Sequence, residues 1–308
     1  MSDQAAKLRR LAAGGAPPAK EPARDGPSEP SSVTARVIAV TSGKGGVGKT
    51  TLAVNLALLL AEEGARVLIV DADLGLANVD VMLGLDSSRH MGHLLLPGYE
   101  AADISTVGPR NIRVISGGSG LRELAEASPV ERRLLIGKLR TYFREFDYVF
   151  IDTSPGIGAE VIDFLREADD ICLVTTPEPT SLRDTYAATK AIASHLPESE
   201  IQLIVNVAGS ETEAKKAVEA LNAVTYKFLD RRSLVWRWVE SDPTVARAVR
   251  QRVPVALSYP RSPAALSMRR LAKSLVQPVV RPACAPISEG DGELTTALSG
   301  GGPNALVC

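Results

Sequence analysis

The stretch Val37-Ile-Ala-Val-Thr-Ser-Gly-Lys-Gly-Gly-Val-Gly-Lys-Thr-Thr51 decides the fold of this 308-residue chain. Its β-branched beginning predicts a buried strand, and an apolar pattern with helical spacing starts at Lys49. The glycines between them leave the backbone without Cβ atoms, so that consecutive N–H groups can surround a triphosphate. The predicted nucleotide-binding residues are therefore Gly43, Lys44, Gly45, Gly46, Val47, Gly48, Lys49, Thr50 and Thr51.

Two side chains of this loop carry the chemistry. Lys49 can place its ammonium group against the β- and γ-phosphate oxygens, and Thr50 can offer its hydroxyl to Mg²⁺. The same glycine and lysine spacing also arises by chance in turns, but here a predicted strand precedes it and a predicted helix follows. The sequence therefore predicts a P-loop that binds a nucleoside triphosphate with Mg²⁺.

A second lysine, Lys44, lies five residues before Lys49, where an ordinary P-loop needs no cation. With it the loop resembles the deviant Walker A family, Lys-Gly-Gly-x-Gly-Lys-Thr, which includes MinD, ParA and the flagellar regulator FlhG, also called FleN. The resemblance implies that ATP and Mg²⁺ are bound and that slow ATP hydrolysis depends on an ATP-dependent homodimer. It also implies that Lys44 acts catalytically from across the dimer interface. A solvated loop lysine is the alternative for Lys44.

Composition limits the class of protein. A hydrophobic content of 45% allows one α/β core of about 240 residues. The net charge of −1 argues against a broad electrostatic contact with nucleic acid, so direct binding of nucleic acid is not expected. The cysteines Cys172, Cys284 and Cys308 lack a pairing or metal-binding spacing, and Cys172 is expected in the core. Because no signal peptide or long apolar run is recognised, a cytoplasmic location is expected.

The two ends of the chain differ in composition from the middle. Residues 1–13 are predicted to form a short partner-activating helix, and residues 14–34 a flexible linker of Pro, Gly, Ala and Ser. Residues 278–308 are again rich in Pro and Gly and are predicted to be a disordered tail. Only residues 35–277 are expected to pack as a MinD-like ATPase domain.

Within residues 35–277, apolar runs alternate with helical patterns. Strands are predicted near residues 36–41, 66–71, 112–116, 147–152, 170–175 and 201–207, and helices near residues 49–63, 129–145, 159–167, 180–195, 212–223 and 263–276. The alternation predicts an α/β fold, the doubly wound, mainly parallel sheet of a P-loop NTPase, with helices on both faces. Such sheets bind ligands at the carboxyl ends of their strands.

Carboxylates end two of these strands. Asp71 and Asp73 follow Val67-Leu-Ile-Val70, and alternation places both toward the phosphate site. Asp152 ends Tyr148-Val-Phe-Ile-Asp152, a Walker B form in which the terminal carboxylate joins the Mg²⁺ shell. An aspartate at such a position can instead cap the following turn. The resemblance makes Asp73 the hydrolytic aspartate and Asp71 its neighbour near the metal. The predicted Mg²⁺ ligands, direct or through water, are Thr50, Asp71 and Asp152.

Three further features are assigned by the same resemblance. Gly156 matches the switch glycine that responds to the γ-phosphate, and the segment 176–180 with Asp184 matches a loop beside the base and the dimer seam. Asn206 ends the strand run Ile201-Gln-Leu-Ile-Val-Asn206 and matches an asparagine that reads the adenine base. An amide can both donate to and accept from the edge of adenine, but a plain Asx turn is the alternative.

The N-terminal segment points to one branch of the family. Asp3-Gln4-Ala5-Ala6-Lys7-Leu8-Arg9 resembles an element of FlhG proteins that docks on the GTPase FlhF and stimulates GTP hydrolysis, so Asp3, Gln4, Leu8 and Arg9 are the predicted partner-binding residues. Gln4 and Leu8 would share one face of a helix too short to be stable without a partner. A frayed terminus without a function is the alternative. The segments 117–124, 248–251 and 259–264 also resemble FlhG proteins.

These features predict an ATP-dependent switch that regulates flagellar number and placement. A ParA- or MinD-type positioning ATPase, acting in DNA segregation or division-site placement, is the alternative. A flagellar transcription factor or switch-complex protein is a further candidate partner. The amphipathic stretch 266–276 fits a packing helix better than a membrane-surface helix, which leaves attachment to the inner face of the membrane or the cell pole open. Arginines at 231–252 could form a DNA-binding surface, but Glu240 and Asp242 interrupt them.

Overall fold

The predicted strand–loop–helix unit is present, because β1 (Arg36–Thr41) runs through the glycine loop into α2 (Lys49–Glu62). The structure is a computed structural model that describes residues 34–74, 77–118, 127–229 and 235–276. The predicted N-terminal helix, most of the predicted linker and the predicted tail lie outside these ranges. The segment 117–124, which resembles FlhG proteins, is described only as far as residue 118.

In the described ranges, one mainly parallel sheet of eight strands has the order β3-β4-β2-β5-β1-β6-β7-β8. The other strands are β2 (Val67–Ala72), β3 (Thr106–Val107), β4 (Arg113–Ile115), β5 (Tyr148–Thr153), β6 (Asp170–Thr175), β7 (Ile201–Ala208) and β8 (Val235–Glu240). Every pairing is parallel except that of β3 with β4. The order reverses around β1, which places the loop after β1 at the switch point where such sheets bind ligands.

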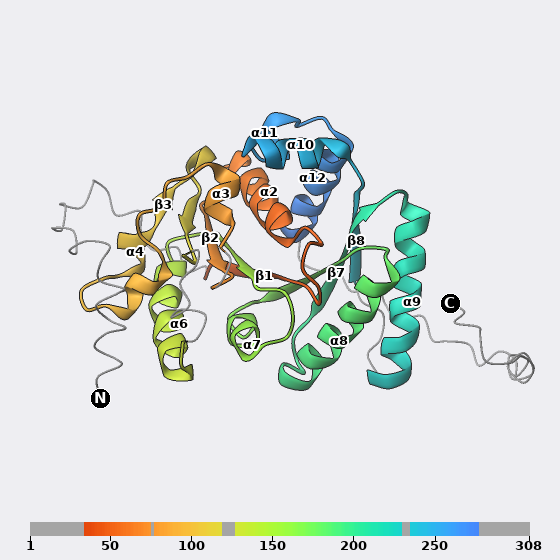
Figure 1. Ribbon diagram of the computed structural model, residues 1–308, viewed down its shortest axis with the longest axis horizontal. Coiled ribbons are helices and arrows are strands. Elements are labelled where there is room, and N and C mark those ends of the chain that lie inside the picture. The colour runs from red at the N-terminus through yellow and green to blue at the C-terminus, as the bar shows by residue number, and fades with distance from the viewer. Residues whose placement is uncertain (1–33, 75–76, 119–126, 230–234, 277–308) are drawn as a thin grey trace, which may run out of the picture.

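Helices cover both faces of the sheet (Figure 1). The helices, besides α2, are α3 (Val79–Leu83), α4 (Ala101–Ile104), α6 (Pro129–Phe143), α7 (Ala159–Leu165), α8 (Pro179–His195), α9 (Glu211–Leu229), α10 (Pro243–Gln251), α11 (Val255–Ser258) and α12 (Pro263–Val276), with short 3₁₀ turns at Met91–Leu95 and Pro109–Asn111. Alternation along β1 feeds two cores. Ile38 and Val40 pack with α2 and α12, and Ala39 faces the core with α6, α7, α8 and α9. The predicted doubly wound fold is confirmed.

Two expectations about packing are confirmed. Met268, Leu271 and Leu275 of α12 are buried against the sheet, so the amphipathic stretch is a packing helix of the fold. Cys172 is buried in β6, and burial raises the pKa of its thiol to about 12. No helix among the described residues is both long and apolar enough to cross a membrane.

The main element that the sequence pattern does not predict is β8. It lies at the edge of the sheet and pairs only with β7 among the described strands. Of its residues only Val239 is buried, so the strand lacks the continuous apolar run of a central parallel strand. The predicted helix at 212–223 is also too short, since α9 continues to Leu229.

Candidate nucleotide-binding site

The glycine loop has a backbone that other residues would strain. Gly46 and Gly48 have φ values of +80° and +92°, and Gly48 is the left-handed residue that begins α2. A Cβ atom at Gly43 would overlap the backbone carbonyl of Asp184, because the loop packs against the first turns of α8. Asp184 was assigned by resemblance to a loop beside the site, and here its backbone supports the P-loop.

Gly43→Ala is expected to destabilise the fold by about 1–3 kcal/mol, because its new methyl group meets backbone that cannot rotate away. Gly45→Ala is the matched control, since the nearest atom to its Cβ would be a Pro155 carbon at 3.8 Å. Urea unfolding of both variants without nucleotide measures the difference. Equal stabilities would contradict the described contact between the loop and α8.

One buried cation lies among three carboxylates at the carboxyl edge of the sheet. Lys49 is only 8% exposed, and Asp71 and Asp152 are register partners on the neighbouring strands β2 and β5. Burial lowers the pKa of Lys49, while the charges of Asp152, Asp73 and Asp71 oppose that shift. The structure therefore brings together the lysine and the aspartates that the sequence assigned to nucleotide and metal.

Asp152 has the surroundings of a metal ligand. Its side chain is 1% exposed, it accepts a hydrogen bond from the Thr50 side chain, and its Oδ1 has no hydrogen-bond partner among the described residues. Burial raises the pKa of Asp152 to about 6, and Thr50 and the charge of Lys49 limit the rise. A hydroxyl and a carboxylate with a free oxygen suit Mg²⁺, which prefers oxygen ligands. Thr50 and Asp152 would thus hold the ion.

Asp152→Asn is expected to stabilise the nucleotide-free protein by about 1–3 kcal/mol at pH 7.5 while removing Mg²⁺-dependent hydrolysis. Because the folded pKa of Asp152 is above the unfolded value of 3.8, its ionised form destabilises the fold fully above pH 6, and this penalty shrinks as the pH falls from 6 toward 3.8. Urea unfolding at pH 7.5 and pH 5 measures the effect. Asp147→Asn is the control of opposite sign, since Arg66 lowers the pKa of Asp147. A loss of stability in Asp152→Asn would contradict the prediction.

Asp71 has a different environment. Its Oδ1 accepts the backbone N–H of Asp73 at 3.1 Å, and its Oδ2 accepts those of Asn78 and Val79 at 2.8 and 3.0 Å. These three donors lower the pKa of Asp71. Burial, and to a smaller extent the charge of Asp152, outweigh them and raise the pKa to about 8. This is the contact pattern of a carboxylate that caps the following loop, the alternative that the sequence left open. Its role near the metal stays a prediction.

Asp73 lies beyond the last residue of β2, so strand alternation does not orient its side chain. The hydroxyl of Ser154 donates to Asp73 Oδ1 at 3.2 Å and joins Asp73 to the loop after β5. In the same loop Gly156 has a φ of +100°, and its N–H donates to the carbonyl of Ser42 at 2.8 Å. Sequence reasoning gave no role to Ser42 or Ser154, although they directly follow the strands β1 and β5.

The two remaining predicted residues contact the protein itself. Lys44 Nζ is 3.1 Å from the hydroxyl of Thr180 and 3.4 Å from Glu178 Oε2, so Lys44 is held at the start of α8. Asn206 is buried, and its Nδ2 donates to the carbonyl of Val47 at 2.8 Å, which ties β7 to the P-loop. Because β7 continues to Ala208, Asn206 does not end the strand as expected. Its reading of adenine stays a prediction.

This geometry agrees with comparisons to known proteins. The model of the ParA family, described as NUBPL iron-transfer P-loop NTPase, matches residues 33–276. The chain belongs to the ParA family of P-loop NTPases. This ParA-family chain is 38% identical over 240 residues to the antiactivator FleN of Pseudomonas aeruginosa, covering 78% of the chain and 86% of FleN. It is 33% identical over 218 residues to the flagellum site-determining protein YlxH of Helicobacter pylori, covering 70% and 74%.

A solved structure supports the same assignment. The septum site-determining protein MinD of Pyrococcus horikoshii, in a complex with Mg-ADP, is 26% identical to this ParA-family chain and has a TM-score of 0.65, covering 78% of the chain and 96% of MinD. Membership of the ParA/MinD family and closeness to the FlhG branch are therefore confirmed. The roles of individual residues stay predictions, and Asp3, Gln4, Leu8 and Arg9 lie outside the described residues.

Proposed function

We propose that this ParA-family protein is an ATP-dependent dimerising switch that regulates flagellar number and placement. The observation that supports the flagellar assignment most is its 38% identity to the antiactivator FleN, along nearly the whole described part of the chain. The similarity to YlxH, a flagellum site-determining protein by name, points the same way. The output of such a switch is a surface that changes with the nucleotide.

In this proposal, different residues bind ATP, bind Mg²⁺ and promote hydrolysis. The P-loop backbone and Lys49 hold the phosphates of ATP, and Thr50 and Asp152 hold Mg²⁺, which neutralises charge on the β- and γ-phosphates. Asp73, positioned by Ser154, orients the attacking water. Lys44 leaves Glu178 and Thr180 when a second copy approaches and then contacts the nucleotide of that copy. Hydrolysis is slow and requires the dimer, because Lys44 completes the site only there.

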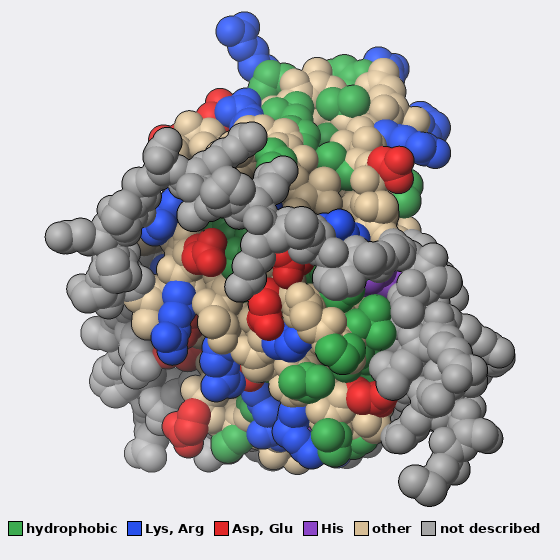
Figure 2. Space-filling model, turned by 90° about the vertical axis from the view of Figure 1, so that its left-hand side faces the viewer, with side chains coloured by type: hydrophobic (Ala, Val, Ile, Leu, Met, Phe, Trp, Pro, Cys, Tyr) green, Lys and Arg blue, Asp and Glu red, His purple; other side chains and the backbone are tan. Residues whose placement is uncertain are grey.

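A positioning ATPase for DNA segregation or division sites is the alternative function. DNA segregation would need a basic surface for the phosphate backbone. On the face shown in Figure 2, Lys and Arg side chains are interspersed with Asp and Glu rather than gathered. Of these two alternative functions, the structural similarity to MinD favours division-site placement over DNA segregation. Because α12 buries its apolar stripe, α12 is not available as a membrane-surface helix, and we propose that partner proteins, such as a flagellar transcription factor or a switch-complex protein, recruit the protein to the cell pole or the membrane surface.

The proposed GTPase partner gives a direct test. A synthetic peptide of residues 1–20 is expected to raise the GTP turnover of an FlhF-type GTPase about tenfold or more, because Gln4 and Leu8 would present one helical face to it. A peptide with Gln4→Ala and a scrambled peptide are the controls. If the rates of GTP hydrolysis are the same with all three peptides, the N-terminal segment does not activate this partner.

A further inference from the structure

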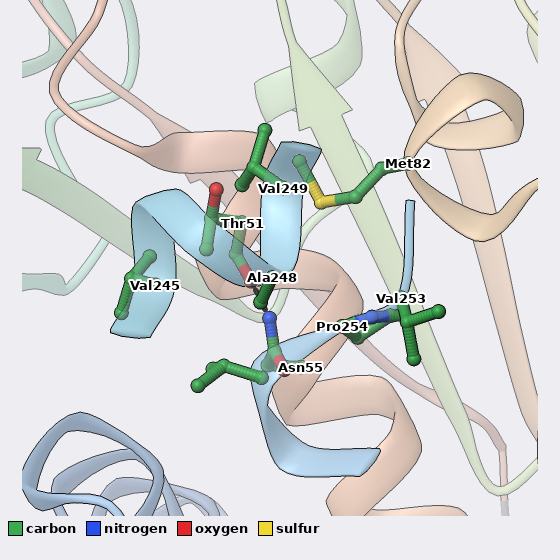
Figure 3. A pocket seen from close by; sticks show the side chains of 9 residues that line it. Thr51, Asn55, Met82, Val245, Ala248, Val249, Val253 and Pro254 are labelled. Atoms are coloured by element: carbon green, nitrogen blue, oxygen red, sulfur yellow. Dashed lines mark hydrogen bonds between the residues drawn. The ribbon is translucent and has the colours of Figure 1, made fainter. Parts of the chain in front are cut away.

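A shallow apolar hollow lies beside the nucleotide loop. It is lined by residues of α2, α3, α10 and the connection to α11. In Figure 3 the side chains of Met82, Val249 and Val253 surround this hollow, with Thr51 and Asn55 of α2 at its base. Thr51 directly follows the predicted Mg²⁺ ligand Thr50, so the hollow lies next to the P-loop.

The rim of the hollow exposes apolar side chains to solvent. Val249 is 43% exposed, Val253 is 40% exposed, and Val81 of α3 is 49% exposed. The end of α3 lies against the end of α10, because a Cβ atom at Gly84 would be 3.8 Å from the carbonyl oxygen of Arg252. These residues therefore form one apolar surface on α3 and α10, which we call the α10 surface.

The charged side chains of α10 and of the residue that directly follows it are all arginines. Arg247, Arg250 and Arg252 alternate with its apolar residues, and all three are exposed. None of the three has an ion pair with another described residue, whereas Arg269 on the neighbouring α12 pairs with Glu62 at 2.8 Å. An apolar surface bordered by arginines without carboxylate partners is complementary to an acidic segment that carries apolar side chains.

The chain itself contains such a segment. Residues 288–298 read Ser-Glu-Gly-Asp-Gly-Glu-Leu-Thr-Thr-Ala-Leu, with carboxylates at 289, 291 and 293 directly before Leu294. Residues 277–308 contain a single basic side chain, Arg281, which lies seven residues before this segment. The N-terminal segment 1–33 fits less well, since lysine and arginine at positions 7, 9, 10, 20 and 24 separate its acidic residues.

The tail is long enough to reach the hollow. The carbonyl of Leu275 accepts a hydrogen bond from Arg36 at the start of β1, so α12 ends at the edge of the sheet opposite the P-loop. The two edges are about 20 Å apart, since α2 has 14 residues at about 1.5 Å each. The 12 residues from 277 to 288 can span about 40 Å when extended. A tether of this length gives an effective concentration on the order of millimolar.

We propose that residues 288–298 dock on the α10 surface of their own chain, with Leu294 on the exposed side chains of Val249 and Val253 and the three carboxylates against Arg247, Arg250 and Arg252. The segment then covers apolar surface beside the P-loop and excludes other partners from it. This docking does not depend on a flagellar function. Any acidic protein that binds the same surface would have to displace the tail.

Disulfide trapping in the full-length chain tests the docking. Cys284 and Cys308 are replaced by serine, and the buried Cys172 is kept. The pair Val253→Cys with Leu294→Cys is expected to form an intrachain disulfide under mild oxidation at least about tenfold faster than the pair Leu134→Cys with Leu294→Cys. Leu134 is the matched control, because it is 49% exposed on α6, which packs on the opposite face of the sheet. Peptide mapping identifies the bond.

A charge exchange separates specific docking from chance collision. Arg250→Glu with Arg252→Glu is expected to slow the trapping about tenfold, and Glu289→Arg, Asp291→Arg and Glu293→Arg added to that variant are expected to restore it. The two arginines are exposed, so unchanged unfolding midpoints verify the fold. Equal rates for the Val253 and Leu134 pairs, an unchanged rate after charge reversal, or a disulfide that joins two chains would each overturn the proposal.

Discussion

Lys49→Ala is expected to weaken the binding of Mg-ATP about 100-fold or more. Lys49 is 8% exposed and lies among Asp71, Asp73 and Asp152, whose charges oppose the lowering of its pKa by burial. Without this ammonium group, a bound triphosphate would meet these carboxylates with only Mg²⁺ to compensate. Removing one partner of a buried, hydrogen-bonded charge pair costs about 2–5 kcal/mol, and about 2.7 kcal/mol corresponds to a factor of 100.

Calorimetric titration with a non-hydrolysed ATP analogue measures this loss. Lys44→Ala is the matched control, because Lys44 is in the same loop but is 39% exposed and contacts the start of α8. We expect Lys44→Ala to bind the analogue with an affinity within a few-fold of the wild type and to stay monomeric. If both variants lose binding equally, the two lysines do not have the separate roles that we propose for them.

The contrast between these lysines shows how far the sequence predicts the site. The spacing of the glycines and Lys49 requires one loop conformation, so its strand, loop and helix follow from local sequence alone. The contact of Lys44 with Thr180 joins residues 136 positions apart. Its existence depends on how β1 and β6 pair, which periodicity does not specify.

Asp71 and Asn206 show the same limit. Strand alternation orients Asp71, which lies within β2, but it does not specify the partners of the carboxylate. The N–H groups that bind Asp71 come from a loop whose path no local signal predicts. For Asn206 the strand end indicated a polar contact at the site, but the sequence could not show that the carbonyl of Val47 would accept its amide hydrogen.

The edge of the sheet was the least predictable part of the fold. Its strand β8 has the tryptophans Trp236 and Trp238 only partly buried against one core, so its pattern resembles that of a polar connection. Asp242 lies two residues after β8, and its carboxylate accepts backbone N–H groups of Thr244 in α10 and Ala264 in α12, so the chain leaving β8 fixes where α10 begins. A missed edge strand therefore hid the two helices that follow it, including the α10 surface.

Asp73→Ala is expected to keep ATP binding, to slow ATP hydrolysis at least about 100-fold, and to accumulate dimers. A positioned general base or water-orienting group contributes about 10²–10⁴-fold to such reactions. Asp73 accepts a hydrogen bond from Ser154, which lies in the loop that contains Gly156, the residue that we propose responds to the γ-phosphate. Its loss removes the step that reopens the dimer, while the P-loop, Lys49 and Thr50 remain intact.

Light scattering after size exclusion with ATP, together with phosphate release, measures both effects. Ser154→Ala is the graded control, since it removes the hydroxyl that donates to Asp73 and leaves the carboxylate, so a smaller loss of turnover is expected. The double variant Lys44→Ala with Asp73→Ala separates dimerisation from hydrolysis. It should bind ATP, fail to hydrolyse it and stay monomeric, because blocked hydrolysis preserves a dimer only where Lys44 can form one. A monomeric Asp73→Ala protein beside a dimerising wild type would contradict the role assigned to Asp73.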